Sequence, residues 1–339
     1  MRIVKILLVA FALPLLLSVL STSCSKTGYT VTSTTADSSS QIIMANDELK
    51  VSYEFDQVIN EAILATSISY IASGNTQSIG NIQSIGNGNV QWNEIPQCYI
   101  DTAQIIDSAL VRLEYYGKNA DDTKGRTGWV TLQLARDGSG HVIPWRTPGA
   151  VMNITFQQYE VTVLATNVSI WINGSATVTN ITGGQLYLPA NISFPAGDSL
   201  QDKVSGNISF TYNDNSAVIV TYPWNISHTR TFTMQNSVLT STIRGDSLMS
   251  GSTVISTSGQ TRFGSGFYTQ ITKPVVQSIS PAYILSNPLS GEKVINGIPE
   301  PITIDYGVNS SGNAVQSNPY GYKMTWMHGG GQGVCVVSY

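Results

Sequence analysis

The chain has 339 residues, of which 11% are charged, and its 17 basic and 21 acidic residues give a formal net charge of −4. Soluble globular proteins have about a quarter of their residues charged, whereas here Ser, Thr, Asn and Gln supply most of the polarity, a composition that favours β-strands with neutral outer faces. An acidic chain without clusters of Lys and Arg is not expected to bind nucleic acid, because phosphate contacts need concentrated positive charge.

The beginning of the chain has the features of an export signal. Arg2 and Lys5 form a positive region, residues 6–20 are largely apolar, and Ser21–Ser23 are small residues of the kind found at cleavage sites. We therefore predict that residues 1–23 are a signal peptide that is removed. The mature chain then keeps 15 basic and 21 acidic residues, a formal charge of −6, and contains no segment apolar enough to be a membrane-spanning helix.

Cleavage after the signal would leave Cys24 at the new N-terminus, where its thiol can take a lipid. The sequence "SCSK" and the Ser/Thr-rich segment after it resemble the signal of bacterial lipoproteins, especially those of the Bacteroidota. This resemblance implies that Cys24 carries palmitate-type chains and anchors the protein to the outer membrane of the cell envelope, on a side left open. Alternatively, Cys24 is an incidental thiol of a secreted protein. Residues 24–48 are expected to form a flexible tether, because they contain few large apolar side chains.

Residues 56–72 have the clearest helical spacing in the chain. We predict at most one short helix here, although the β-branched second half would also suit a strand. The following segment, residues 73–89, repeats Ser-Ile-Gly-Asn and is expected to be a loop. The residues that share one side of the predicted helix are Val58, Ile59, Ala62, Ile63 and Thr66.

From about residue 97 onward, segments such as "YEVTVLA", "ISFTY" and "ITIDYG" alternate apolar and polar residues with the period of a β-strand. Asn173-Gly174 and Gly183-Gly184 suit tight turns between strands. We therefore predict an all-β body over residues 49–339, an antiparallel β-sandwich made of one unit or of two packed β units. In the second case the Pro-marked region 274–288 would be the boundary.

The order of several segments resembles a group of exported Bacteroidota lipoproteins over roughly residues 97–310. These segments are "LEYYG", "GRTGWVTLQL", "PGAVMNITFQQYEV", "INGSATVTN", "HTRTFTM", "GFYTQITKPVV", "PLSGEKVI" and "ITIDYG". The resemblance implies an exported, lipid-anchored, all-β protein. It implies no activity, because none is known for the group.

Three cysteines occur in the chain. If Cys24 is acylated, Cys98 and Cys335 remain as an even pair in an oxidising compartment, where they would be able to form a disulfide. Two separately buried thiols are the alternative, because the sequence gives no distance between them.

Motifs that would indicate catalysis or metal binding are weak. "HGGGQG" (328–333) resembles an oxyanion-hole motif, but the chain has no Gly-x-Ser-x-Gly nucleophile motif, so we predict a hairpin loop there. His141, His228 and His328 have no partners at metal-ligand spacing, and "ARDGSG" suits a hairpin turn better than a calcium loop. We therefore assign no catalytic, metal or cofactor residues.

The segment "WNISHTRTFTM" contains the most suggestive strand face. On a β-strand, His228, Arg230 and Phe232 point to one side, with Trp224 nearby. Such a face is able to stack on and hydrogen-bond a sugar or peptide. The alternative is a strand whose Phe lies in the core and whose Arg pairs across the sheet.

These features predict a non-enzymatic cell-envelope lipoprotein with a structural or ligand-binding role. Its expected partners are the membrane, through the lipid anchor, and a glycan or an envelope protein. One alternative is a glycan-active hydrolase with carboxylates from distant strands, for which Glu114, Glu160 and Asp305 are candidates. Another is an adhesin or surface-layer component that self-associates through strand edges.

Overall fold

A computed structural model gives the arrangement of most of the body. The signal peptide (1–23), Cys24 and the loop predicted at 73–89 lie outside the described residues, so these predictions stay predictions. The structure describes residues 39–67, 97–100, 110–118, 124–164, 167–184, 199–213, 220–235, 238–248, 253–279, 285–298, 300–328 and 330–339.

The described part of the chain forms one helix and sixteen strands. They are α1 (Ser39–Ser67), β1 (Gln97–Ile100), β2 (Leu110–Lys118), β3 (Lys124–Leu134), β4 (Val151–Val163), β5 (Val168–Asn180), β6 (Ser199–Asn213), β7 (Thr221–Gln235), β8 (Val238–Gly245), β9 (Ser247–Leu248), β10 (Val254–Ile255), β11 (Thr257–Gln260), β12 (Gly266–Ile279), β13 (Leu285–Asn296), β14 (Ile302–Val308), β15 (Gly321–His328) and β16 (Gly331–Ser338).

Fourteen of the strands belong to one antiparallel sheet in which most strands pair with their neighbours in the sequence. β8 and β11 both lie between the longer β7 and β12, and β9 pairs with β10 as a separate ribbon. The prediction of an all-β, sandwich-like antiparallel fold is confirmed. β12 and β13 pair with each other across the region 274–288, so the sheet is not interrupted where we placed a sub-boundary.

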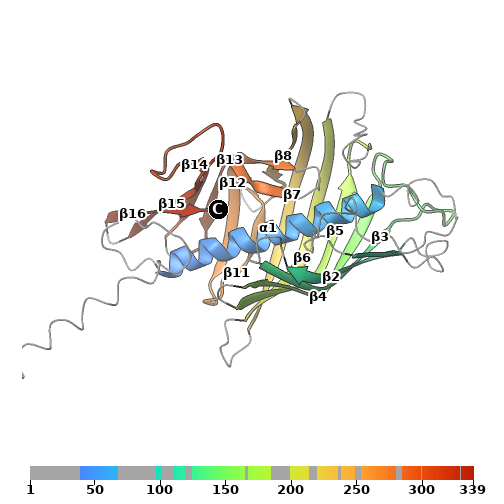
Figure 1. Cartoon of the computed structure of the whole chain (residues 1–339), viewed down its shortest axis with the longest axis horizontal. Coiled ribbons are helices and arrows are strands. Elements are labelled where there is room, and N and C mark those ends of the chain that lie inside the picture. The colour runs from blue at the N-terminus through green and yellow to red at the C-terminus, as the bar shows by residue number, and fades with distance from the viewer. Residues whose placement is uncertain are drawn as a thin grey trace, which may run out of the picture.

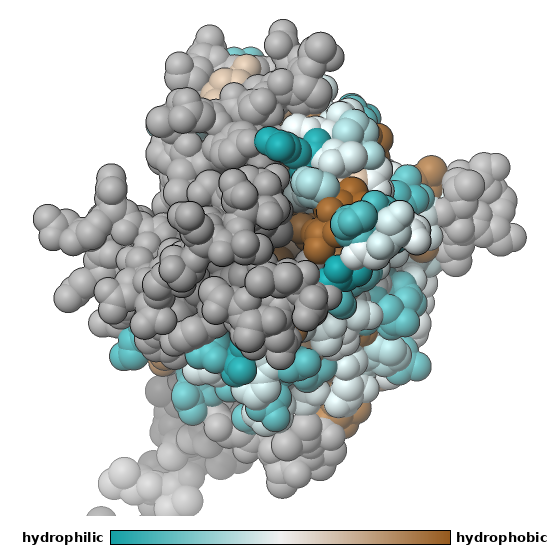
Figure 2. All heavy atoms as spheres, turned by 90° about the vertical axis from the view of Figure 1, so that its right-hand side faces the viewer, coloured by the Kyte–Doolittle hydropathy of each residue, from teal (hydrophilic) through white to brown (hydrophobic). Residues whose placement is uncertain are grey.

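The alternation of the strands sorts their side chains into a buried inner face and a polar outer face. In β6, for example, Val204, Ile208 and Phe210 are buried whereas Lys203 and Ser205 are exposed. The described residues on the side of the molecule seen in Figure 2 are mostly hydrophilic or neutral at the surface.

The helix α1 runs the length of the molecule along the curved sheet, from the β14–β16 end to the β3 end (Figure 1). Our prediction of a short helix near 56–72 was therefore wrong in its start and its length, because α1 begins at Ser39. Residues 39–48, which we assigned to the tether, form the first part of this helix instead. Their charged and apolar side chains contact strands that lie far away in the sequence, and these contacts are invisible to local composition.

Both the apolar and the polar sides of α1 are buried. The predicted apolar residues Val58, Ile59, Ala62 and Ile63 are at most 1% exposed, but Asp56, Gln57, Asn60 and Glu61 are buried as well. Because the sheet curves, its strands contact the helix on both sides. In the part of α1 around residues 56–63, no face of the helix is exposed to solvent. An amphipathic pattern, which identifies a helix lying on a surface, is accordingly weak here.

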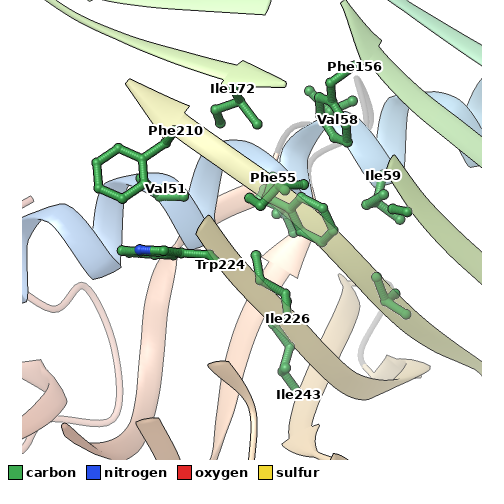
Figure 3. Close-up of a cluster of buried hydrophobic side chains, with 14 of the residues drawn as sticks. Val51, Phe55, Val58, Ile59, Phe156, Ile172, Phe210, Trp224, Ile226 and Ile243 are labelled. Atoms are coloured by element: carbon green, nitrogen blue, oxygen red, sulfur yellow. The ribbon is translucent and has the colours of Figure 1, made fainter. Parts of the chain in front are cut away.

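The core lies between α1 and the inner face of the sheet, as the side chains in Figure 3 show. Phe55 stacks on Phe156 with ring centroids 5.6 Å apart. Its ring also fills the space above Gly206, where a Cβ atom would lie 2.7 Å from Cζ of Phe55. Trp224 packs edge-on against Phe210 and Phe267. A glycine in the middle of β6 therefore lets the helix approach the sheet closely.

Two of the predicted turns are confirmed, but the turn predicted at Asn173-Gly174 was wrong, because both residues lie inside β5. "HGGGQG" joins β15 to β16, with His328 paired to Gly331. In "ARDGSG", the carboxylate of Asp137 accepts hydrogen bonds from the backbone N–H groups of Ser139 and His141, which closes a turn. Within the described residues, no helix is long and apolar enough to cross a membrane.

Candidate functional site

Acidic residues along α1 pair with basic residues that point inward from the sheet. The bases come from β3, β7, β13 and the turn after β11, so the contacts extend over most of the helix. The pairs are Asp47 with Arg262, Glu48 with Lys293 at 3.2 Å, Glu54 with Lys124 at 3.0 Å, Asp56 with His228 at 2.9 Å, and Glu61 with Arg126 at 2.8 Å.

The pair between Glu61 and Arg126 is the most completely buried of these contacts to a guanidinium. Two guanidinium nitrogens of Arg126 donate to the two carboxylate oxygens of Glu61 at 2.8 and 2.9 Å. Glu61 also accepts from the Tyr115 hydroxyl at 2.7 Å, and Nε of Arg126 donates to the Tyr159 hydroxyl at 2.7 Å. Burial, together with the negative charge of Glu61, raises the pKa of Tyr115 well above its ordinary value. The hydroxyls of this cluster therefore act as neutral hydrogen-bonding groups.

The electrostatic environment keeps two further helix carboxylates ionised. Burial raises the pKa of Glu54, but the charges of Lys124 and Arg126 outweigh it and hold the pKa below its ordinary value. Burial likewise raises the pKa of Asp56, and the positive charges of His228 and Arg230 outweigh it. Hydrogen bonds and opposite charges thus compensate the cost of burying these groups.

The strand face predicted as a ligand surface on β7 is buried. Trp224, Arg230 and Phe232 are at most 2% exposed, and His228 is 4% exposed. Arg230 forms a two-pronged pair across the sheet with Asp202 of β6, at 2.9 and 2.7 Å, and donates to Oδ1 of Asn60 at 2.8 Å. The prediction of a ligand surface was therefore wrong for Trp224, Arg230 and Phe232. The alternative, in which the Phe lies in the core and the Arg pairs across the sheet, is confirmed. His228, unlike these three residues, also lines a pocket between α1 and the sheet.

A hollow of about 690 Å³ lies on the outer face of the sheet, over β2 to β5. It has two tryptophans, Trp129 and Trp171, whose neighbours along β3 and β5, such as Val130 and Ile172, are buried on the other face. In the pairing register, Trp129 lies opposite Glu114 on one side, and Trp171 lies opposite Glu160. The other residues that line this outer hollow are Arg112, Tyr115, Thr127, Gly128, Gln158 and Asn173.

Two irregularities in strand pairing shape the outer hollow. The register shifts between Thr127 and Trp129 where β3 meets β4, and again between Phe156 and Tyr159 where β4 meets β5. Gly128, with φ of 93°, and Gln158, with φ of 54°, lie at these shifts. A Cβ atom on Gly128 would come within 2.0 Å of the Gln158 carbonyl oxygen, so only glycine fits. Bulges of this kind bend strands and re-aim side chains, and they are common beside binding sites.

Several polar groups surround the two tryptophans. The guanidinium of Arg112 lies over the Trp129 ring, 4.7 Å from its centroid, and pairs with Glu114 at 2.8 Å. Nε1 of Trp129 donates to the side-chain carbonyl of Gln157. Nε1 of Trp171 has no hydrogen-bond partner among the described residues. The outer hollow thus combines two aromatic rings, of which Trp129 is held in place, with hydrogen-bonding groups.

The structure brings together two of the three carboxylates named for the hydrolase alternative. Glu114 and Glu160 both line the outer hollow, whereas Asp305 lies on β14 and pairs with Lys323 at 3.0 Å. The sequence analysis missed Trp129 and Trp171. The sequence contained the information needed to find them. In each strand, the alternation of apolar and polar residues places the Trp on the face that points away from the core.

The remaining predicted residues stay apart from this hollow. Cys335 is buried in β16. Cys98 lies in β1, at the other end of the strand order, and its side chain is outside the described part of the structure, so the disulfide stays a prediction. His141 is exposed in the turn formed by Asp137. Among the described residues, no group of three His, Cys, Asp or Glu side chains is placed to bind a metal.

Comparison with known proteins gives no match: no protein-family model, curated protein or solved structure is similar to this chain.

Proposed function

We propose that this protein is a lipid-anchored cell-envelope protein that binds a glycan in the outer hollow over β2 to β5. The observation that carries the proposal is the pair of outward-facing tryptophans, Trp129 and Trp171, within one hollow lined by polar side chains. Tryptophan is costly on the outer face of a sheet unless it contacts something, because it leaves a large apolar surface in water.

The chemistry of the outer hollow suits a sugar chain. The faces of sugar rings carry C–H groups that pack on aromatic rings, while their hydroxyls need hydrogen-bond donors and acceptors at the edges. Trp129 and Trp171 supply the rings, and Arg112, Glu160 and Asn173 supply the hydrogen-bonding groups. The volume of about 690 Å³ lies within the range of about 300 to 1,000 Å³ typical of ligand sites.

The charge balance favours a neutral glycan. The positive charge of Arg112 is balanced by Glu114. Glu160 is the remaining charged residue among the described residues that line the hollow, and its negative charge has no basic partner there. A strongly acidic polymer would be repelled by it. Trp129 is held by Arg112 and Gln157, so less side-chain entropy is lost when a ligand binds.

Affinity electrophoresis in gels containing soluble neutral polysaccharides tests the proposal. The wild-type protein is expected to be retarded by at least one of them, and Trp129→Ala or Trp171→Ala to weaken binding at least tenfold, because each removes a stacking surface. Phe263→Ala is the control, since Phe263 is an aromatic residue that is 52% exposed outside the hollow. Unchanged retardation of both tryptophan variants would contradict the proposal, as would the absence of retardation in every polysaccharide.

The hydrolase alternative is supported by the presence of Glu114 and Glu160 in the same hollow. We favour binding because the two tryptophans give the hollow a stacking surface, whereas Glu114 is already engaged by Arg112. The retarding polysaccharide serves for this test as well. Release of new reducing ends that stops in Glu114→Gln and Glu160→Gln would replace the binding proposal with hydrolysis.

The location of the protein rests on the predicted signal and on Cys24. We expect the native protein in the membrane fraction to have the mass of residues 24–339 plus covalently attached acyl chains, measured on the intact protein without reduction. A further deficit of about 2 Da would correspond to a disulfide between Cys98 and Cys335. An unmodified chain in the soluble fraction would overturn the lipid anchor and make the protein a secreted one.

A further inference from the structure

A second pocket, open to solvent on one side, lies between α1 and the strands β7, β8 and β12 to β15. Its volume of about 200 Å³ exceeds the roughly 150 Å³ of a cavity that holds benzene in an engineered protein. Its walls are mainly apolar. They include Ile226, Ile243, Ile271 and Val275 from the sheet, and Tyr306 and Tyr322 from β14 and β15.

Charged residues also line this pocket, and most of them have an ion-pairing or hydrogen-bonding partner in the protein. Glu54 lies 3.0 Å from Lys124, and Asp56 lies 2.9 Å from His228. Lys293 lies 3.2 Å from Glu48. The charges of Glu54 and Lys293 are therefore compensated by the protein itself, and Asp56 is engaged by His228.

Lys50 is different from the other charged residues of the pocket wall. Within the described residues, its ammonium group has no carboxylate within 4.0 Å, although it lines the pocket and is only partly exposed. Asp47, one turn earlier on α1, is already bound by Arg262. The three groups together carry one positive charge in excess. Burial and the nearby charge of Arg262 lower the pKa of Lys50, against the opposing effect of Asp47.

We propose that this pocket binds a small amphipathic carboxylate, such as a medium-chain fatty acid, with its carboxylate on Lys50 and its apolar chain among the aliphatic residues of the sheet. A carboxylate supplies the missing negative charge. An ammonium group that has lost part of its hydration is stabilised strongly by an ionised partner of opposite charge. The isoleucine and valine side chains offer no hydrogen bonds and suit an alkyl chain.

Three ligands of equal chain length separate the role of charge from that of the apolar chain. Octanoate, 1-octanol and octylamine are titrated into the mature chain carrying Cys24→Ser, and binding is measured by calorimetry. Octanoate is expected to bind at least tenfold more tightly than 1-octanol, and octylamine to bind most weakly. Equal or tighter binding of 1-octanol or octylamine would overturn the assignment of a carboxylate, and no binding of any of them would overturn the site.

Two variants locate the binding. Lys50→Met keeps the length of the side chain and removes its charge, so octanoate is expected to fall to the affinity of 1-octanol while 1-octanol is unchanged. Lys273→Met is the matched control, because Lys273 is exposed on β12 and pairs with Glu292 away from the pocket. Ile243→Phe, which fills the pocket, is expected to abolish binding of both ligands. Undiminished octanoate binding in either Lys50→Met or Ile243→Phe would place the ligand elsewhere and refute the proposal. The comparison of the three ligands on the unaltered pocket stands even if a variant fails to fold.

Discussion

Replacing Arg126 with methionine is expected to lower the free energy of unfolding by about 3 to 5 kcal/mol, the range for breaking a buried ion pair by removal of one partner. Arg126 is 3% exposed and holds both carboxylate oxygens of Glu61, which is itself 6% exposed. Without the guanidinium, Glu61 is a buried charge with only neutral donors. Chemical denaturation at neutral pH measures the loss.

The sheet provides a matched control for this prediction. Arg112 also pairs with a glutamate at 2.8 Å, but its side chain is 45% exposed on the outer face. Arg112→Met is therefore expected to cost less than about 1 kcal/mol, because exposed ion pairs contribute little. The double variant Arg126→Met/Glu61→Gln is expected to recover part of the loss, since it removes the unpaired charge. A cost for Arg126→Met no larger than that for Arg112→Met would contradict the energetic role of the buried pair.

Truncating Phe55 to alanine is expected to destabilise the protein by about 3 to 5 kcal/mol, as is usual for a fully buried Phe. The Phe55 ring is completely buried between Phe156 and the glycine at position 206 (Figure 3). Its removal leaves a cavity between α1 and β6, and a helix held at many points along the sheet has little freedom to collapse into it. Thermal and chemical unfolding measure the effect.

The reverse substitution tests the same contact from the sheet. Gly206→Ala is expected to be destabilising, because the added methyl group would meet the Phe55 ring at 2.7 Å. Phe55→Leu/Gly206→Ala is expected to be more stable than the sum of the two single changes, since a smaller side chain makes room for the methyl group. Phe263→Ala is the control for an exposed Phe and is expected to change stability by less than about 0.5 kcal/mol. If the stability changes of the two single substitutions simply added up in the double variant, Phe55 and Gly206 would not be in tight contact.

The ion pairs along α1 also explain how the helix takes one position on the sheet. Apolar contacts alone tolerate sliding, since many apolar surfaces fit one another approximately. Moving α1 by one turn would separate Glu48 from Lys293 and Glu61 from Arg126 at the same time. Each separated charge would be buried without a partner, which costs far more than a change in apolar packing.

The strands and several turns were predictable because their signals are local. The side chains of a strand alternate between two faces, so "ISFTY" and "ITIDYG" show their buried positions directly. The turns at Asp137 and between β15 and β16 follow from Gly-rich segments that adopt backbone angles other residues disfavour. The carboxylates Glu114 and Glu160 were also named from the sequence, as residues on strands or near strand ends, but nothing local showed that they share a hollow.

The sequence by itself determined the all-β class, the strand faces, the weak case for a metal site and the prediction of a lipid-anchored exported chain. Only the tertiary structure decided the rest. It placed His228, Arg230 and Phe232 in the interior, extended the helix back to Ser39, and assembled Trp129 with Trp171. The physical reason is the same in each case. Whether a polar strand face or helix side meets water or another charge depends on how strongly the sheet curves, and that curvature is the sum of many strand twists and bulges rather than a property of any one segment.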